Sequence, residues 1–216
     1  DGFAAGVRAE AERAGAPLLG GDLTSAPLIV ITVTVLADQA GVAPVTRAGA
    51  RPGDVVAFVG RLGWAAAGLA VLTRGFRSPG SVVLAHRRPE VPYGEGRVAA
   101  EAGASSMIDV SDGLLADLGH IAQASAVRLE LDSAAFEIAE PQQAVAAAIG
   151  GGDPLVFQLT GGDDHALAAT FAPEDVPAGW RVIGRVVDGE PAVLVDGVAP
   201  ELDAAGWQHF GTQGRA

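Results

Sequence analysis

The stretch MIDVSDGLLADLGHI, residues 107–121, passes from an apolar run into a helix through a Ser-Asp-Gly turn. Three acids, Asp109, Asp112 and Asp117, stand in or just after residues typical of a buried core. A buried carboxylate is costly unless it is paired or holds a metal ion. The pattern therefore leaves two interpretations open: a helix start capped by Ser111 or Asp112, or a cation site.

The spacing of Asp109 and Asp112 suits a site for a cation and phosphates. Two residues separate them across a predicted strand-to-helix turn, so both carboxylates can point toward one end of the element. Backbone N–H groups at the start of a helix attract anions, and the Ser111 hydroxyl can add a contact to a phosphate. Carboxylate oxygens are the ligands that Mg²⁺ prefers in proteins.

Two further loops combine glycines with acids directly after apolar residues: GGD at residues 20–22 and GGDD at residues 161–164. Glycine lets a backbone approach a ligand closely and adopt positive φ. Each loop taken alone is typical of an ordinary turn. The sequence contains no G-x-x-x-x-G-K-[ST] and no G-x-G-x-x-G motif, so a nucleotide enzyme with this sequence would be neither a P-loop nor a Rossmann protein.

Composition limits the classes of protein. The chain has 216 residues, 49% of them apolar, a formal net charge of −12 and no cysteine. Disulfides and thiolate metal sites are excluded, and a nucleic-acid surface, which needs a basic face, is disfavoured. We expect no membrane partner and a cytoplasmic location, because no apolar run is long enough for a bilayer and no signal peptide opens the chain. The four histidines lack metal-ligand spacing, and Ser111 and Ser125 have no evident base partner, so a hydrolase triad is not supported.

The pattern of apolar residues predicts an α+β fold with a mixed or antiparallel sheet, because strands alternate with helices without a regular βαβ rhythm. A break near residues 43–47 divides the chain into domains 1–43 and 44–216. The segment 76–96 is predicted as mostly loop. Helices are predicted over 2–14, 63–75, 97–101, 114–124 and 141–149. Strands are predicted at 18–19, 28–37, 54–60, 106–110 and 127–132, and within 180–189 and 192–197.

Seven segments together resemble those of the thiamine-monophosphate kinases, a family of the aminoimidazole ribonucleotide synthetase-like superfamily. They occur in the family's order and cover nearly the whole chain, and the Asp-x-Ser-Asp-Gly-Leu stretch with its downstream Asp-Leu-x-His-Ile is the most specific. The segments are LLGGDLT (18–24), TRAGARPGD (46–54), VGRLGWAAAGLAVL (59–72), HRRPEVPYGEG (86–96), MIDVSDGLLADLGHIAQAS (107–125), LTGGDDHAL (159–167) and AGWQHF (205–210).

The resemblance implies the two-domain fold of that superfamily. It also implies an enzyme that transfers the γ-phosphoryl group of ATP directly to thiamine monophosphate, giving thiamine diphosphate and ADP with several Mg²⁺ ions. No covalent nucleophile is expected. By match, the Mg²⁺ ligands would be Asp22, Asp109 and Asp112. The ATP contacts would be Gly21, Asp22, Arg47 and Ser111, and the substrate contacts would be Asp163 and Trp207.

The sequence departs from the family pattern in two places. The usual Gly-Gly-Glu-Asp-Tyr-Glu-Leu is here Gly-Gly-Asp-Asp-His-Ala-Leu, so Asp163 is one methylene shorter and Ala166 lacks a carboxylate. The family's Gly-x-Gly-Asp-Asp acid loop and Ser-Thr-Asp strand end are missing from the sequence. We therefore expect residues 1–43 to be the remnant of an N-terminal domain that binds ATP and Mg²⁺, and we expect the chain to bind Mg-ATP poorly.

The resemblance also implies a homodimer formed through the sheet of the N-terminal domain, to which segment 28–36 would belong. Trp207 is interpreted either as a core residue or as a flat surface that packs on the thiamine ring. Two alternatives remain open for the function. One is another ATP-dependent synthetase of the superfamily, and the other is a non-catalytic dimer scaffold with the same fold.

Overall fold

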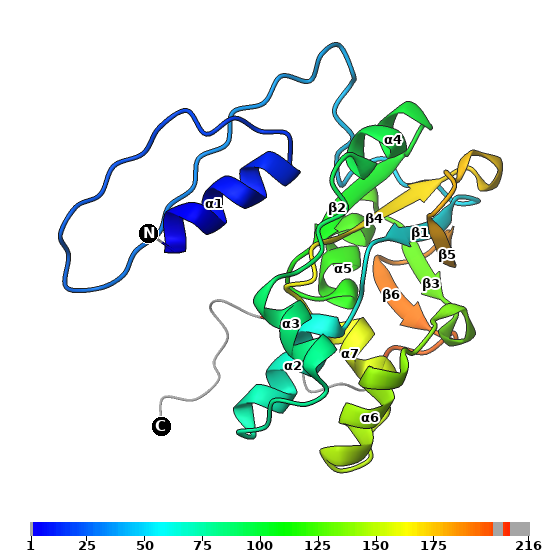
Figure 1. Cartoon of the computed structure of the whole chain (residues 1–216). Coiled ribbons are helices and arrows are strands. Elements are labelled where there is room, and N and C mark those ends of the chain that lie inside the picture. The colour runs from blue at the N-terminus through cyan, green and yellow to red at the C-terminus, as the bar shows by residue number, and fades with distance from the viewer. Residues whose placement is uncertain (1, 201–204, 208–216) are drawn as a thin grey trace. The chain divides into compact units, whose positions relative to one another are not determined.

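The computed structural model describes residues 2–200 and 205–207. Contacts divide the chain into two units, residues 1–41 and 42–216, whose helices and strands are labelled in Figure 1. None of the helices formed by the described residues is long and apolar enough to cross a membrane. The assignment of residues 1–43 to a separate N-terminal domain stays a prediction.

The first unit consists of helix α1 (Gly2–Arg13) followed by extended chain. The predicted helix over 2–14 is confirmed. The strands predicted at 18–19 and 28–37 are wrong for this structure, because the described residues form no strand before Val55 and the apolar side chains of both segments are exposed. A strand needs a hydrogen-bonded neighbour, and no described residue supplies one to these segments.

Within the described residues, the second unit is built on a six-stranded mixed sheet with the strand order β2-β4-β1-β5-β3-β6. Neighbouring strands run antiparallel except β3 and β6, which are parallel. The predicted α+β class with a mixed sheet is therefore confirmed. The strands are β1 (Val55–Val59), β2 (Ser106–Val110), β3 (Arg128–Leu131), β4 (Ala166–Phe171), β5 (Arg181–Val187) and β6 (Ala192–Val195).

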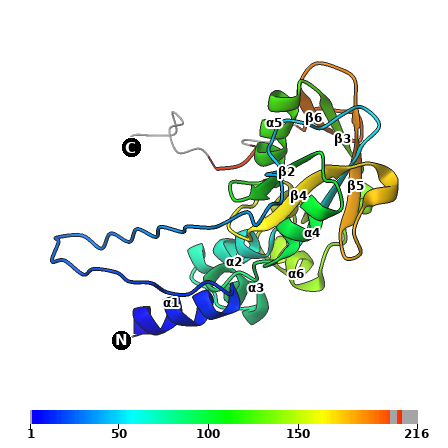
Figure 2. The ribbon, with the colours of Figure 1, turned by 90° about the horizontal axis from the view of Figure 1, so that it is seen from above.

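Helix α5 (Leu114–Ser125) covers one face of the sheet and the short helix α4 (Glu95–Glu101) lies on the other, as Figure 2 shows. Alternate side chains of a strand point to opposite faces. In β2 this alternation buries Ile108 and Val110 in the core beneath α5. The same alternation leaves Asp109 exposed on the opposite face, which places a carboxylate on the outside of the strand that leads into α5.

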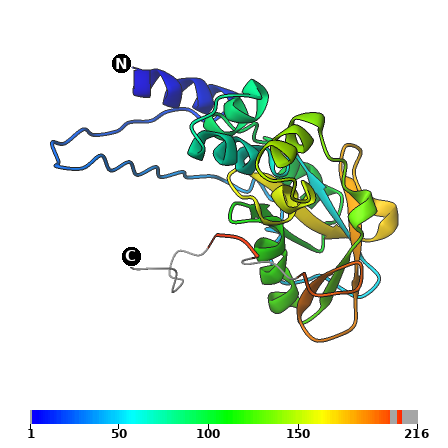
Figure 3. The same ribbon diagram turned by 90° about the horizontal axis from the view of Figure 1, so that it is seen from below.

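Helices α2 (Trp64–Thr73), α3 (Gly80–Arg87) and α6 (Glu140–Ala148) share a further apolar cluster, and they are seen from below in Figure 3. Helix α3 lies inside the segment predicted as mostly loop, so that prediction is wrong in part. The reason is packing: Gly68 of α2 has no side chain, and an added Cβ would collide with the Val82 carbonyl of α3. This close approach buries α3 against α2. The packing outweighs the weak helix propensity of the α3 segment.

The other elements that the sequence predicts in the second unit lie close to their predicted positions, whereas β4 and α7 were not predicted. Strand β2 has the bounds that the sequence predicts, and the predicted helices that became α2, α4, α5 and α6 are confirmed within two residues at each end. Short helical segments complete the unit: α7 (Leu155–Thr160), η1 (Ser133–Ala135) and η2 (Pro173–Asp175).

Candidate functional site

The turn between β2 and α5 is organised by one buried side chain. Oδ2 of Asp117 accepts the backbone N–H groups of Ser111 at 3.0 Å, Asp112 at 3.1 Å and Gly113 at 3.1 Å. Asp117 is only 3% exposed. The N-cap of α5 is Gly113, with no side-chain cap, so the interpretation of Ser111 or Asp112 as the helix cap is wrong. Capping of α5 is therefore not the role of either side chain.

Asp117 is a residue whose role the sequence did not reveal. Burial raises the pKa of its carboxyl, while the three backbone N–H groups act in the opposite direction and the nearby charge of Asp112 raises it further. One signal was available: Asp117 falls on the apolar face of α5, between the buried Leu114 and Ile121. An acid in that position needs local partners, and the turn just before the helix provides them.

The GGDD loop, which joins α7 to β4, packs directly against this turn. The N–H of Asp163 donates to the carbonyl oxygen of Ser111 at 3.1 Å. A Cβ added to Gly162 would collide with the same carbonyl. The glycine therefore permits the approach, and the Asp163 side chain is exposed beside Ser111 and Asp112.

Asp164, the last acid of the GGDD loop, turns inward instead. It is 2% exposed, and its Oδ1 accepts the N–H of Ala65 at 2.9 Å in the first turn of α2. Its Oδ2 is buried without a hydrogen-bond partner. Burial raises the pKa of Asp164 to about 6, and the backbone N–H groups at the start of α2 together with Arg61 only partly offset that effect. Nothing in the sequence of the loop distinguishes the exposed environment of Asp163 from the buried environment of Asp164.

The C-terminal Gly206-Trp207 pair also reaches the turn. The N–H of Trp207 donates to the carbonyl oxygen of Asp112 at 2.8 Å, and a Cβ on Gly206 would lie 2.5 Å from that oxygen. Trp207 is 68% exposed, so its interpretation as a core residue is wrong, and its ring presents a flat surface beside the turn. His209, which belongs to the same sequence segment, lies outside the described residues.

Asp109 stands at the boundary of two cavities. One of about 650 Å³ is also lined by Arg47 and Thr46, and the other, of about 430 Å³, is also lined by Tyr93 and His165. Besides Asp109, the two cavities have only Leu167 of β4 in common. The carboxylate is thus accessible from both sides.

The segment that carries Arg47 is fixed along the edge of the sheet. The carbonyl oxygen of Thr46 accepts the N–H of Met107 in β2 at 3.0 Å. The hydroxyl of Ser125 at the end of α5 donates to the Arg47 carbonyl at 3.1 Å. These bonds hold the Arg47 backbone beside β2, and its exposed guanidinium lines the larger cavity with Asp109.

The donor atoms of Asp109 and Asp112 fit Mg²⁺, which takes hard oxygen ligands and keeps several positions for water or phosphate. Among the described residues there is no group of three or more acids, histidines or cysteines able to hold a metal ion. The described residues of the second unit therefore supply at most a pair of carboxylates to one ion. Gly21 and Asp22 belong to the first unit, where both are exposed and Asp22 accepts the N–H of Leu23 at 2.8 Å. Their predicted roles stay predictions.

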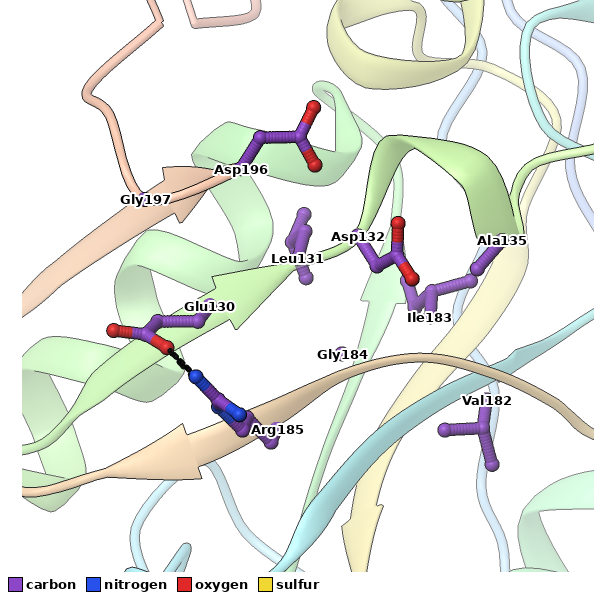
Figure 4. Close-up of a pocket in the computed structure, with 10 residues that line it drawn as sticks. All are labelled: Glu130, Leu131, Asp132, Ala135, Val182, Ile183, Gly184, Arg185, Asp196 and Gly197. Atoms are coloured by element: carbon purple, nitrogen blue, oxygen red, sulfur yellow. Dashed lines mark hydrogen bonds and ion pairs between the residues drawn. The ribbon is translucent and has the colours of Figure 1, made fainter.

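A third hollow has a volume of about 590 Å³ and is shown in Figure 4. The residues that line it differ from those of the candidate site. Its charged side chains already have partners: Glu130 pairs with Arg185 at 2.7 Å, and Asp196 accepts the N–H of Ser133 at 3.0 Å. Hydrogen bonding from Ser133 lowers the pKa of Asp196. None of the predicted site residues lines this hollow.

Comparison with known proteins gives consistent matches. Residues 51–196 match the model of the family described as AIR synthase related protein, C-terminal domain. The chain is 50% identical over 206 residues to the thiamine-monophosphate kinase of Mycobacterium tuberculosis H37Rv, covering 95% of this chain and 61% of that protein. It is 33% identical over 214 residues to the thiamine-monophosphate kinase of Halobacterium salinarum, covering 96% of this chain and 70% of that protein.

A solved structure described as AaThiL complexed with AMPPCP and TMP superposes on the chain with a TM-score of 0.66 at 33% sequence identity. The superposition covers 77% of this chain and 54% of that chain. The chain spans 61% of the length of the Mycobacterium relative.

Proposed function

Because the chain belongs to the thiamine-monophosphate kinase family and carries its AIR synthase related C-terminal domain, we propose that the protein transfers the γ-phosphoryl group of ATP to thiamine monophosphate, forming thiamine diphosphate and ADP. One observation carries the proposal. The Ser111–Gly113 turn, the loop with Asp163 and the segment with Trp207 meet through hydrogen bonds to the carbonyls of Ser111 and Asp112.

The chemistry of this site suits phosphoryl transfer. That reaction depends on positioning and on neutralising phosphate charge more than on a protein nucleophile. In our proposal Asp109 and Asp112 are ligands of Mg²⁺ and Ser111 contacts ATP. Asp22, which belongs to the first unit, is proposed as a Mg²⁺ ligand in its own right. Bound Mg²⁺ supplies charge neutralisation at the phosphates. No covalent enzyme intermediate is needed, because the donor and the acceptor can react directly when they are held in line.

The two cavities that meet at Asp109 suit a donor and an acceptor. We place the phosphates of ATP in the larger one, where the Arg47 guanidinium can pair with them. We place the phosphate of thiamine monophosphate on the side lined by His165, adjacent to Asp163. The exposed ring of Trp207 then offers a stacking surface to the heteroaromatic part of the acceptor.

The remaining properties are also proposals. A net charge of −12 argues against a nucleic-acid partner, and the helices of the described residues offer no membrane span. We propose a cytoplasmic enzyme that forms a homodimer through the first unit. The exposed apolar residues of segment 28–36 support the dimer, because contact with a second copy would bury these side chains away from water.

The test is an ADP-release assay with ATP, Mg²⁺ and thiamine monophosphate. The wild-type chain, which we expect to bind Mg-ATP poorly, is expected to release ADP slowly at high Mg-ATP, and only when the acceptor is present. Asp112→Asn is expected to lower kcat/KM at least about 100-fold, because a ligand for Mg²⁺ is lost. Asp175→Asn removes the same charge from an exposed position in η2 and serves as the control, with unchanged activity. ADP release independent of thiamine monophosphate would favour a sister synthetase, and none at all would favour the scaffold.

A further inference from the structure

The GGDD loop holds an unusual backbone conformation around Asp164. Asp163 has φ of 63° and His165 has φ of 55°, so both neighbours of Asp164 lie in the left-handed region. Residues other than glycine adopt this region at a cost in free energy, which the surrounding structure must offset. The loop carries the exposed Asp163 and the cavity-lining His165, so its conformation decides where both side chains lie.

The carboxylate of Asp164 connects this loop to helix α2. It reaches 99 residues back along the chain to the Ala65 N–H, at the first turn of α2. A carboxylate in that place also interacts favourably with the positive end of the helix dipole. The start of α2 is itself tightly held, because a Cβ on Gly63 would lie 2.7 Å from the Phe157 carbonyl oxygen of α7.

The two neighbouring acids of the loop therefore have different tasks. We propose that Asp164 is a positioning residue: by anchoring the GGDD loop to α2, it holds Asp163 against Ser111 and sets the geometry with which the site receives the phosphorylated acceptor. This inference rests on the proposed function. Asp164 touches no reacting atom and acts only through Asp163 and its N–H bond to Ser111.

The chemistry of Asp164 argues for a role beyond stability. Its Oδ2 is buried without a partner, which makes the charged side chain expensive in the folded state. A side chain selected only for packing would be apolar at a position that is 2% exposed. Its Oδ1 accepts the Ala65 N–H at 2.9 Å, and that bond connects the loop at the site to α2.

The experiment compares three variants. Asp164→Ala removes the acceptor, whereas Asp164→Asn keeps an oxygen that can accept the Ala65 N–H. Thr170→Val is the matched control: Thr170 is fully buried, its hydroxyl bonds Ser106 at 2.7 Å, and it lies toward the other end of β4. For each protein we would measure the melting temperature, KM for thiamine monophosphate, KM for ATP, and hydrogen exchange of the Asp163 N–H relative to the Ala57 N–H in β1.

Asp164→Ala is expected to raise KM for thiamine monophosphate about 10-fold with less than a 3-fold change in KM for ATP, and to speed exchange of the Asp163 N–H relative to Ala57 about 100-fold. Asp164→Asn is expected to keep the KM for thiamine monophosphate and the exchange rate of the Asp163 N–H within about 3-fold of the wild-type values. Thr170→Val is expected to lower only the melting temperature. Equal behaviour of Asp164→Ala and Thr170→Val would overturn the inference, as would failure of Asp164→Asn to restore the exchange rate.

The exchange measurement also separates this inference from the proposed function. If the wild type shows no turnover with thiamine monophosphate, the proposed function fails while the exchange rates still decide whether Asp164 holds the loop. If turnover is normal and the exchange rates of Asp164→Ala match the wild type, the proposed function stands and the anchoring role fails.

Discussion

At the scale of single residues, Asp117 is the side chain on which the turn between β2 and α5 depends most. Asp117→Ala leaves three N–H groups without their acceptor, so we expect the free energy of unfolding to fall by about 3 kcal/mol. Urea unfolding measures the change. Asp132→Ala, which removes an exposed acceptor of the single Ala134 N–H, is the control and should cost less than about 1 kcal/mol. Similar losses in the two variants would contradict the role of Asp117.

Asp164 makes stability depend on pH in a predictable direction. Burial raises its pKa from the ordinary 3.8 to about 6, so the unfolded chain loses this proton before the folded chain does. The free-energy cost of burying the charged carboxylate is absent below pH about 4 and complete above pH about 6. Asp164 therefore lowers the stability of the fold as pH rises through that window. The shift corresponds to about 2 to 3 kcal/mol, at about 1.4 kcal/mol per pKa unit.

The measurement is the difference in unfolding free energy between Asp164→Asn and the wild type, taken from pH 4 to pH 7. We expect the variant to gain stability relative to the wild type as pH rises, because it never carries the buried charge. Asp117 also has a raised pKa, but it is present in both proteins and largely cancels in the difference. A difference that stays constant with pH would contradict the prediction.

At the scale of elements, the site exists because two loops can approach each other without a side chain between them. Gly162→Ala places a Cβ against the Ser111 carbonyl and should push the GGDD loop away from the turn, costing about 2 kcal/mol and most of the activity. Gly119→Ala is the matched control in α5, since no atom lies within 4 Å of its added Cβ. Calorimetry should show Gly119→Ala stabilised by about 0.5 to 1 kcal/mol. Loss of stability in both variants would argue against a specific collision.

Local sequence pattern predicted the elements well where burial follows a simple period. Strand β2, which carries Asp109, and helix α5 are found as expected, and Asp112 lies in the turn between them. Helix α3 was missed because its formation depends on the close approach at Gly68. The anchoring bonds of Asp117 and Asp164 were missed for a related reason. A sequence shows that an acid is present, but its hydrogen-bond partners follow from tertiary contacts.

At the scale of the whole molecule, the apolar segment 28–36 is the feature that the fold of this chain leaves uncovered. We propose that it pairs with a second copy. We predict that Ile31→Lys combined with Val33→Lys lowers the sedimentation coefficient from that of a dimer to that of a monomer, because charged side chains in this exposed segment oppose its pairing with another chain. Leu69→Lys, at a half-exposed position in α2, is the control. A wild type that sediments as a monomer would contradict the proposed dimer.

The position of Trp207 has an optical consequence. The chain has three tryptophans, and Trp180 is 7% exposed with its ring packed edge-on at 5.2 Å from Phe171, whereas Trp207 is 68% exposed. Emission from the exposed indole should therefore be red-shifted and the first to be quenched by iodide. Because the backbone N–H of Trp207 donates to the Asp112 carbonyl, a change in that turn also changes the surroundings of the ring. The native fluorescence of the protein thus provides a label-free signal for titrating nucleotide, Mg²⁺ or acceptor into the site.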